Sequence, residues 1–96
     1  MNTNEAFAKA LRTIRNNKDL TQEDFSIVSS RTYLSELERA IKSPTVEKLD
    51  DITSVLGIHP ITLLAITYMN RGDYLSTKEL CNLIEKEIKA VVQHEE

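Results

Sequence analysis

The stretch Leu20–Ser43, LTQEDFSIVSSRTYLSELERAIKS, decides how the rest of the chain is interpreted. Thr21 is followed three residues later by Asp24, a spacing that resembles a capping box and predicts that a helix begins at Thr21. Ser29 or Ser30 is suited to cap a second helix, because serine oxygens accept hydrogen bonds from the first free backbone N–H groups of a helix. The stretch therefore predicts two short helices joined by an abrupt turn.

The second of these helices has one apolar and one polar face. Leu34, Leu37 and Ile41 recur at spacings of three and four residues, which predicts that they point inward. The opposite face is polar, and its first exposed residues are Arg31 and Thr32, followed by Tyr33. This helix would present its N-terminal side chains to another surface.

Helical periodicity continues on both sides of the opening stretch. A first helix is predicted over residues 4–18, and another is predicted from Pro44 and Thr45 to Gly57. A further helix follows, with His59 as its cap and Pro60 at its first position. The inward stripes of these three helices are Phe7, Leu11 and Ile14; Val46, Leu49, Ile52 and Leu56; and Leu63, Leu64 and Ile66.

A clear break over residues 70–73 precedes one more predicted helix, which starts with the capping-box pair Ser76 and Glu79. The stripe on this last helix consists of Leu80, Leu83, Ile84, Ile88 and Val91. Two interpretations are open: the stripe packs on the chain's own core, or it forms an interface shared with a second subunit. We expect a domain over residues 1–70 and a C-terminal helix within residues 71–96.

The composition favours one small all-α domain of 96 residues, with only two Gly and two Pro. The single cysteine, Cys81, and the two distant histidines, His59 and His94, provide no metal-ligand spacing, and no nucleophile has a partner base nearby. No apolar segment reaches the length of a membrane span. We therefore expect a cytoplasmic protein that is not an enzyme, with no metal, cofactor or membrane partner.

Three segments resemble the Cro/C1-type (Xre-like) helix-turn-helix regulators of phages and bacteria, over roughly residues 8–66. They are LRTIRNNKDLTQEDF at 11–25, RTYLSELERAIKSPTVEKLDDI at 31–52 and LGIHPITLL at 56–64. The second, with TQED, looks especially similar to the small controller proteins of restriction-modification systems. Phage repressors, plasmid regulators and antitoxins share much of it. The resemblance implies a five-helix lambda-repressor-like DNA-binding domain, here with an additional C-terminal helix.

The chain departs from the family pattern at the turn. Family members usually place ten residues between the glutamine that opens helix 2 and the cap of helix 3, with a glycine in the turn. Here Gln22 and Ser30 are eight apart, and no glycine lies between them. The missing residues belong to the end of helix 2 or to the turn, and Ile27 and Val28 are expected to supply the apolar contact beneath it.

The resemblance makes Arg31, Thr32 and Glu36 the residues that face DNA bases. Arginine can donate twice to guanine, threonine can bond a base edge or contact the thymine methyl, and glutamate can accept from cytosine. For Glu36 the alternative is a solvated side chain that phosphates repel. Tyr33 either reaches DNA or packs sideways, and Ser35 bonds either a phosphate or its own backbone.

Other positions are expected to hold the DNA backbone. Gln22, assisted by Thr21, matches the family's phosphate contact at the start of helix 2. The loop after the reading helix would grip phosphates through Arg39, Lys42, Ser43 and Thr45. The resemblance also implies a structural ion pair between Arg15 and Glu38.

The charge distribution agrees with this orientation. Residues 1–48 carry eight basic against seven acidic residues, whereas residues 49–96 carry four against eight, so that an acidic second half can face away from DNA. We expect a transcriptional regulator that binds double-stranded DNA as a homodimer at a palindromic operator, with RNA polymerase as a possible protein partner. The alternative is an antitoxin or protein-interaction module whose acidic C-terminal half binds a toxin.

Overall fold

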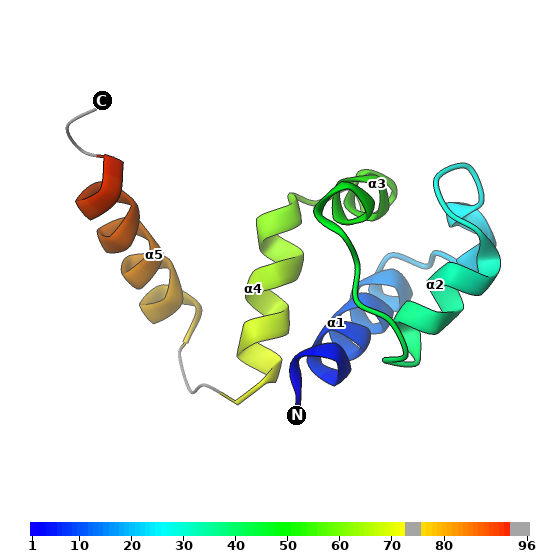
Figure 1. Ribbon diagram of the computed structural model, residues 1–96, viewed down its shortest axis with the longest axis horizontal. Coiled ribbons are helices and arrows are strands. Elements are labelled where there is room, and N and C mark those ends of the chain that lie inside the picture. Colours follow the sequence, from blue (N-terminus) through cyan, green and yellow to red (C-terminus); the bar gives the residue numbers. More distant parts are fainter. Residues whose placement is uncertain (73–75, 93–96) are drawn as a thin grey trace.

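The computed structural model describes residues 1–72 and 76–92, and every regular element within them is helical (Figure 1). The prediction of an all-α fold is therefore confirmed. Asp73, in the predicted break, and His94, in the C-terminal tail, lie outside the described residues. In chain order the elements are α1 (Thr3–Asn17), η1 (Gln22–Phe25), α2 (Arg31–Glu38), α3 (Val46–Leu56), α4 (Pro60–Asn70) and α5 (Thr77–Val92).

Helix α1 lies at the centre of the domain, packed against both α2 and α4. It begins with a complete capping box, in which Glu5 N–H donates to Asn2 Oδ1 at 2.9 Å and Asn2 N–H donates to Glu5 Oε1 at 3.0 Å. Its predicted stripe is buried as expected and meets inward residues of the other elements. The fully buried larger side chains of this core are Leu11, Phe25, Leu34, Leu37, Ile52, Leu56 and Leu63.

The second predicted helix is only the single 3-10 turn η1. The capping pair is present, since Thr21 N–H donates to the Asp24 carboxylate at 2.7 Å. However, the backbone N–H groups of Val28 and Ser29 both bond to the Phe25 carbonyl at 3.0 Å. The chain therefore turns directly after Phe25 and does not continue as a helix. The shortened connection thus removes most of a helix. Val28 is half-buried against the core, but Ile27 is 87% exposed, so its expected role beneath the turn is wrong.

Helix α2 is capped by Ser30, whose hydroxyl accepts from Tyr33 N–H at 3.0 Å. It ends earlier than its apolar stripe suggested. Ala40 takes a left-handed conformation with φ of 61°, and Ile41 N–H turns back to the Glu36 carbonyl at 2.9 Å. Ile41 therefore lies beyond the helix and is 55% exposed, so the prediction that it points inward is wrong.

Helices α3 and α4 follow the predicted bounds closely. The Thr45 hydroxyl accepts from Lys48 N–H at 3.1 Å, and His59 Nδ1 accepts from Ile61 N–H at 3.0 Å, which confirms both caps. Gly57 ends α3 with φ of 72°, a conformation that suits glycine. Val46 does not join the inward stripe: at the first position of α3 it faces away from the core and is 80% exposed.

Helix α5 packs beside α4, apart from the other helices (Figure 1). The predicted capping box is present, because Glu79 N–H donates to Ser76 Oγ and Ser76 N–H donates to Glu79 Oε1, both at 3.1 Å. Leu80 and Ile84 are half-buried, whereas the stripe's other members are exposed. The helix contributes no buried residue, so the chain's own core covers its stripe only in part.

Within the two described ranges, no single helix is long and apolar enough to cross a membrane. The pair α3 and α4 reaches the required length and composition only when taken together, across a bend of 101°.

Candidate nucleic-acid interface

Glu38 fixes α2 to the rest of the domain. Its side chain is 4% exposed, and Arg15 donates to it twice, from Nε at 2.6 Å and from Nη2 at 2.9 Å. The hydrogen bond to Glu38 raises the pKa of the Arg15 guanidinium above its ordinary value, against the effect of burial. The ion pair that the resemblance implied is therefore present, with two parallel bonds from arginine to carboxylate.

Helix α1 makes two more such bonds, one to the end of α2 and one to the connection that precedes η1. The Arg12 guanidinium donates to the backbone carbonyl of Glu38, and Arg15 Nη1 donates to the Leu20 carbonyl at 3.0 Å. The role of Arg12 was not predicted from the sequence. Its signal was available, because Arg12 lies three residues before Arg15 and therefore on a neighbouring part of the same helix face.

Gln22 opens η1 as predicted, but its side chain already has a partner in the domain. Its Nε2 atom donates to Glu38 Oε1 at 3.1 Å. An amide nitrogen carries two hydrogens, so one donor remains for another acceptor. The same buried carboxylate thus orients both α2 and the start of η1.

A polar hollow of about 400 Å³ opens between η1 and the outer face of α2. We use the name polar hollow for the space lined by Gln22, Arg31, Thr32, Ser35 and Arg39. Arg31 is 79% exposed, with its Nη1 atom 4.0 Å from the Glu23 carboxylate. Arg39 Nε donates to Ser35 Oγ at 3.2 Å. Two guanidinium groups therefore flank a threonine and a serine hydroxyl on one surface.

Glu36 does not line the polar hollow with Arg31 and Thr32. Its side chain is 21% exposed, and Lys42 Nζ lies 3.3 Å from its Oε1 atom. This lysine comes from the loop after α2, so the pair lies beside the helix end. The carboxylate is thereby partly neutralised where the resemblance placed a base reader.

Tyr33 lies on the other flank of α2. Its ring is half-buried and packs against the core. Of the two predicted orientations of Tyr33, the structure therefore shows the one in which the side chain packs sideways on the protein. The ammonium groups of Lys42 and Lys48 each lie 5.8 Å from the ring centre, a distance typical of cation–π contacts. Lys48 was missed, because nothing in its local sequence indicates contact with a residue fifteen positions earlier.

The remaining predicted backbone contacts lie on exposed segments. Thr21 precedes η1, and its hydroxyl donates to Asp24 Oδ2 at 3.2 Å. Ser43 Oγ donates to Asn4 Oδ1 at 2.6 Å, which ties the loop after α2 to the start of α1. Thr45 caps α3, while the side chain of Lys42 is 52% exposed. Several predicted DNA contacts therefore also hold the fold together.

The chain is similar to known proteins both in its family and in its fold. A family model described as helix-turn-helix matches residues 11–63, more than half of the chain. The clp gene regulator ClgR from Corynebacterium glutamicum has a similar crystal structure, with a TM-score of 0.67 and 24% identity. The match covers 99% of this chain and 95% of that one, and it concerns the fold. No curated protein sequence matches significantly.

Proposed function

Since the chain belongs to the Cro/C1-type helix-turn-helix family and is a DNA-binding transcriptional regulator, we propose that it binds a palindromic operator as a homodimer. The family is one of regulatory DNA-binding proteins rather than enzymes. The observation that carries the proposal is the polar hollow, where Arg31 and Thr32 stand exposed at the N-terminal end of α2.

The proposed reading residues differ in how well their surroundings support them. Arg31 and Thr32 are exposed and have the donors and acceptors that major-groove edges require, and each good pairing discriminates between bases by about 1–3 kcal/mol. Glu36 is a weaker candidate, because reading cytosine would require its carboxylate to leave Lys42. Tyr33 would act mainly by supporting α2 from the side.

Phosphate contacts would surround these readers. Gln22 retains one amide donor beside the polar hollow, with Thr21 next to it. Arg39 and Lys42 add positive charge at the end of α2. Hydroxyl groups at Ser35, Ser43 and Thr45 would complete the contacts to the DNA backbone.

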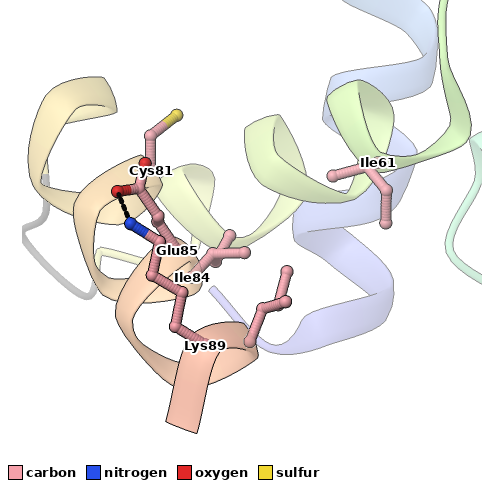
Figure 2. Close-up of a pocket in the computed structure, with 6 residues that line it drawn as sticks. Ile61, Cys81, Ile84, Glu85 and Lys89 are labelled. Carbon is pink, nitrogen blue, oxygen red and sulfur yellow. Dashed lines mark hydrogen bonds and ion pairs between the residues drawn. The ribbon is translucent and has the colours of Figure 1, made fainter. Parts of the chain in front are cut away.

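The proposed dimer interface combines α5 with the neighbouring face of α4. Two openings of about 380 and 390 Å³ lie between these helices, and Ile61, Cys81 and Ile84 line both. The first of the two is drawn in Figure 2. Figure 2 shows Ile61 on α4 and Ile84 on α5 bordering the same space. The exposed stripe residues Leu83, Ile88 and Val91 extend this apolar surface along α5. Leu80 lines it as well. A second copy would cover it and complete the core of the dimer.

A selection from random duplex DNA, combined with a mass measurement in solution, tests this function. We expect enrichment of a palindrome whose half-site centres lie about one helical turn, or about 34 Å, apart, and a dimer of about 22 kDa, twice the 10.9 kDa of the chain. A monomer that enriches no sequence would contradict the proposal. It would favour instead the antitoxin alternative, in which another protein covers α5. A cytoplasmic location follows if the operator is chromosomal or plasmid DNA.

A further inference from the structure

The shortened connection between η1 and α2 is held from α3. Lys48 Nζ donates to the backbone carbonyl of Val28 at 2.8 Å. Val28 lies in the connection, two residues before the cap of α2, and its side chain packs on the core. A carbonyl in so short a turn has no following helical turn to pair with, and a charged donor bonds it more strongly than a neutral one.

The same ammonium group has two further neighbours. It lies 5.8 Å from the centre of the Tyr33 ring and 3.9 Å from Asp51 Oδ2, one turn further along α3. Asp51 is 48% exposed, so this ion pair orients the lysine without burying it. Lys48 therefore joins three parts of the domain: α3, the connection, and the flank of the proposed reading helix.

We propose that Lys48 is a positioning residue for operator recognition: by fixing the Val28 carbonyl and Tyr33, it sets the angle at which α2 presents Arg31 and Thr32. This inference rests on the proposed function. In a family member of usual length, a longer helix 2 and its turn would support this connection. Here the two residues are missing, and the hydrogen bond from Lys48 supports the connection instead. Lys48 thereby affects the specificity for a DNA sequence, although it does not itself contact a base.

A direct phosphate contact is the competing role for Lys48, whose side chain is 39% exposed. The two roles differ in what they change. Loss of a phosphate contact weakens binding to all sequences similarly and reduces the dependence of affinity on salt by about one unit of slope. Loss of a positioning residue misaligns the base readers, which lowers the ratio of operator to nonspecific affinity.

Binding measurements on Lys48→Met and Lys48→Arg separate these roles. Methionine keeps a long apolar stem but no donor, whereas arginine keeps charge and donors; Lys86→Met, on the exposed side of α5, is the matched control. For Lys48→Met we expect the specificity ratio to fall about tenfold, the equivalent of one impaired base pairing. The salt slope should stay unchanged, and Lys48→Arg should restore most of the ratio. A uniform loss with a smaller slope, or no change, would overturn the inference.

A second measurement needs no DNA and separates failure of this inference from failure of the proposed function. Amide hydrogen exchange should become faster at Val28 and Ser29 in Lys48→Met, because their bonds to the Phe25 carbonyl depend on a fixed connection. Protection in α1 and α4 should persist, which shows that the domain remains folded. Unchanged exchange at Val28 and Ser29 would refute the positioning role, even if the wild-type protein bound no operator.

Discussion

Glu38 is a buried carboxylate whose donors come from two other elements. Arg15 supplies two bonds from α1, and Gln22 supplies one from η1. Such a carboxylate is stabilising only while its partners are present, because desolvation of an unpaired charge costs several kcal/mol. One residue of the proposed reading helix therefore serves the fold, while its neighbours on the outer face remain available to DNA.

Removal of this carboxylate should destabilise the protein strongly. For Glu38→Ala we expect the free energy of unfolding to fall by about 3 kcal/mol, because Arg15 would be left charged and 85% covered without its partner. Urea denaturation measures this loss. Glu36→Ala, in the same helix but paired with Lys42 at the surface, is the control and should change stability by less than about 1 kcal/mol. Equal effects of both substitutions would argue against the anchoring role.

Arg31 and Lys42 should affect DNA binding in different ways. Arg31→Ala should remove about 1–3 kcal/mol of discrimination at one base pair while nonspecific binding is mostly retained. Lys42→Ala should instead weaken all sequences and lower the salt slope by about one. Binding to an operator and its single-base variants at several salt concentrations distinguishes the two. An unchanged base preference in Arg31→Ala would exclude it as a reader.

At the scale of elements, the end of α2 is defined by a left-handed residue that is not glycine. Ala40 has φ of 61°, and its N–H bonds to the Leu37 carbonyl at 3.2 Å while Ile41 N–H reaches the Glu36 carbonyl. This pair of bonds is a Schellman motif, which usually has glycine at the left-handed position. The chain therefore has backbone strain at the boundary between α2 and the loop that follows it.

Replacement of this alanine should stabilise the domain. Ala40→Gly relieves a left-handed penalty of about 1–2 kcal/mol and adds backbone entropy to the unfolded state, so a net gain of up to about 1 kcal/mol is expected. Thermal denaturation provides the measurement. Ala90→Gly, within exposed α5, is the matched control and should be destabilising. A loss of stability in Ala40→Gly would mean that the alanine methyl contributes packing that outweighs the strain.

The start of α5 should respond to acid. Hydrogen bonds from Ser76 to Glu79 lower the pKa of this carboxylate below its ordinary value of 4.5. The contribution of the cap is therefore complete above pH 4.5 and is lost as the pH falls through the lowered folded-state pKa. The protection of the amides in the first turn of α5, measured relative to their intrinsic exchange rate at each pH, should therefore decrease as the pH falls over this range. Glu79→Gln should show weaker pH dependence, and equal dependence in both proteins would contradict this assignment.

At the scale of the whole molecule, the domain has a covered core on one side and an open apolar surface on the other. Helices α1 to α4 and η1 surround the core. Helix α5 lies outside this arrangement and packs mainly against α4. The exposed stripe lies away from the polar hollow, on an element distant from α2 (Figure 1). This separation would let the proposed DNA-binding surface and the proposed dimer interface be occupied at the same time.

A charge within the α5 stripe should disrupt the dimer without unfolding the chain. Ile88 is 52% exposed, so Ile88→Glu adds little burial cost in the monomer, whereas its carboxylate would be desolvated in the proposed interface. Sedimentation should show monomers, and operator affinity should fall because two linked half-site contacts become one. Asn82→Glu, an exposed position on the same helix, should remain dimeric. A dimeric Ile88→Glu protein would place the interface on α4 instead.

Local features of the fold were predictable because they depend on residues close together in sequence. Caps at Thr21, Ser30, Thr45, His59 and Ser76 are hydrogen bonds across two or three positions, and the apolar stripes of α1 and α4 repeat within one helix. The periodicity of apolar residues could not show at which residue the stripe leaves the core and becomes exposed to solvent. Ile41 and Val46 fit the pattern but are exposed, because the chain leaves the core at the end of α2 and returns only within α3.

The sequence by itself determined an all-α domain, its helix caps, and, through family resemblance, the pairing of Arg15 with Glu38. Only the tertiary structure decided that helix 2 is a single 3-10 turn, that Glu36 pairs with Lys42, and that Arg39 joins Arg31 at the polar hollow. It also brought Lys48 to Val28 across twenty positions. The physical reason is that capping and periodicity act within a few residues, whereas these contacts exist only after distant helices have packed on a common core.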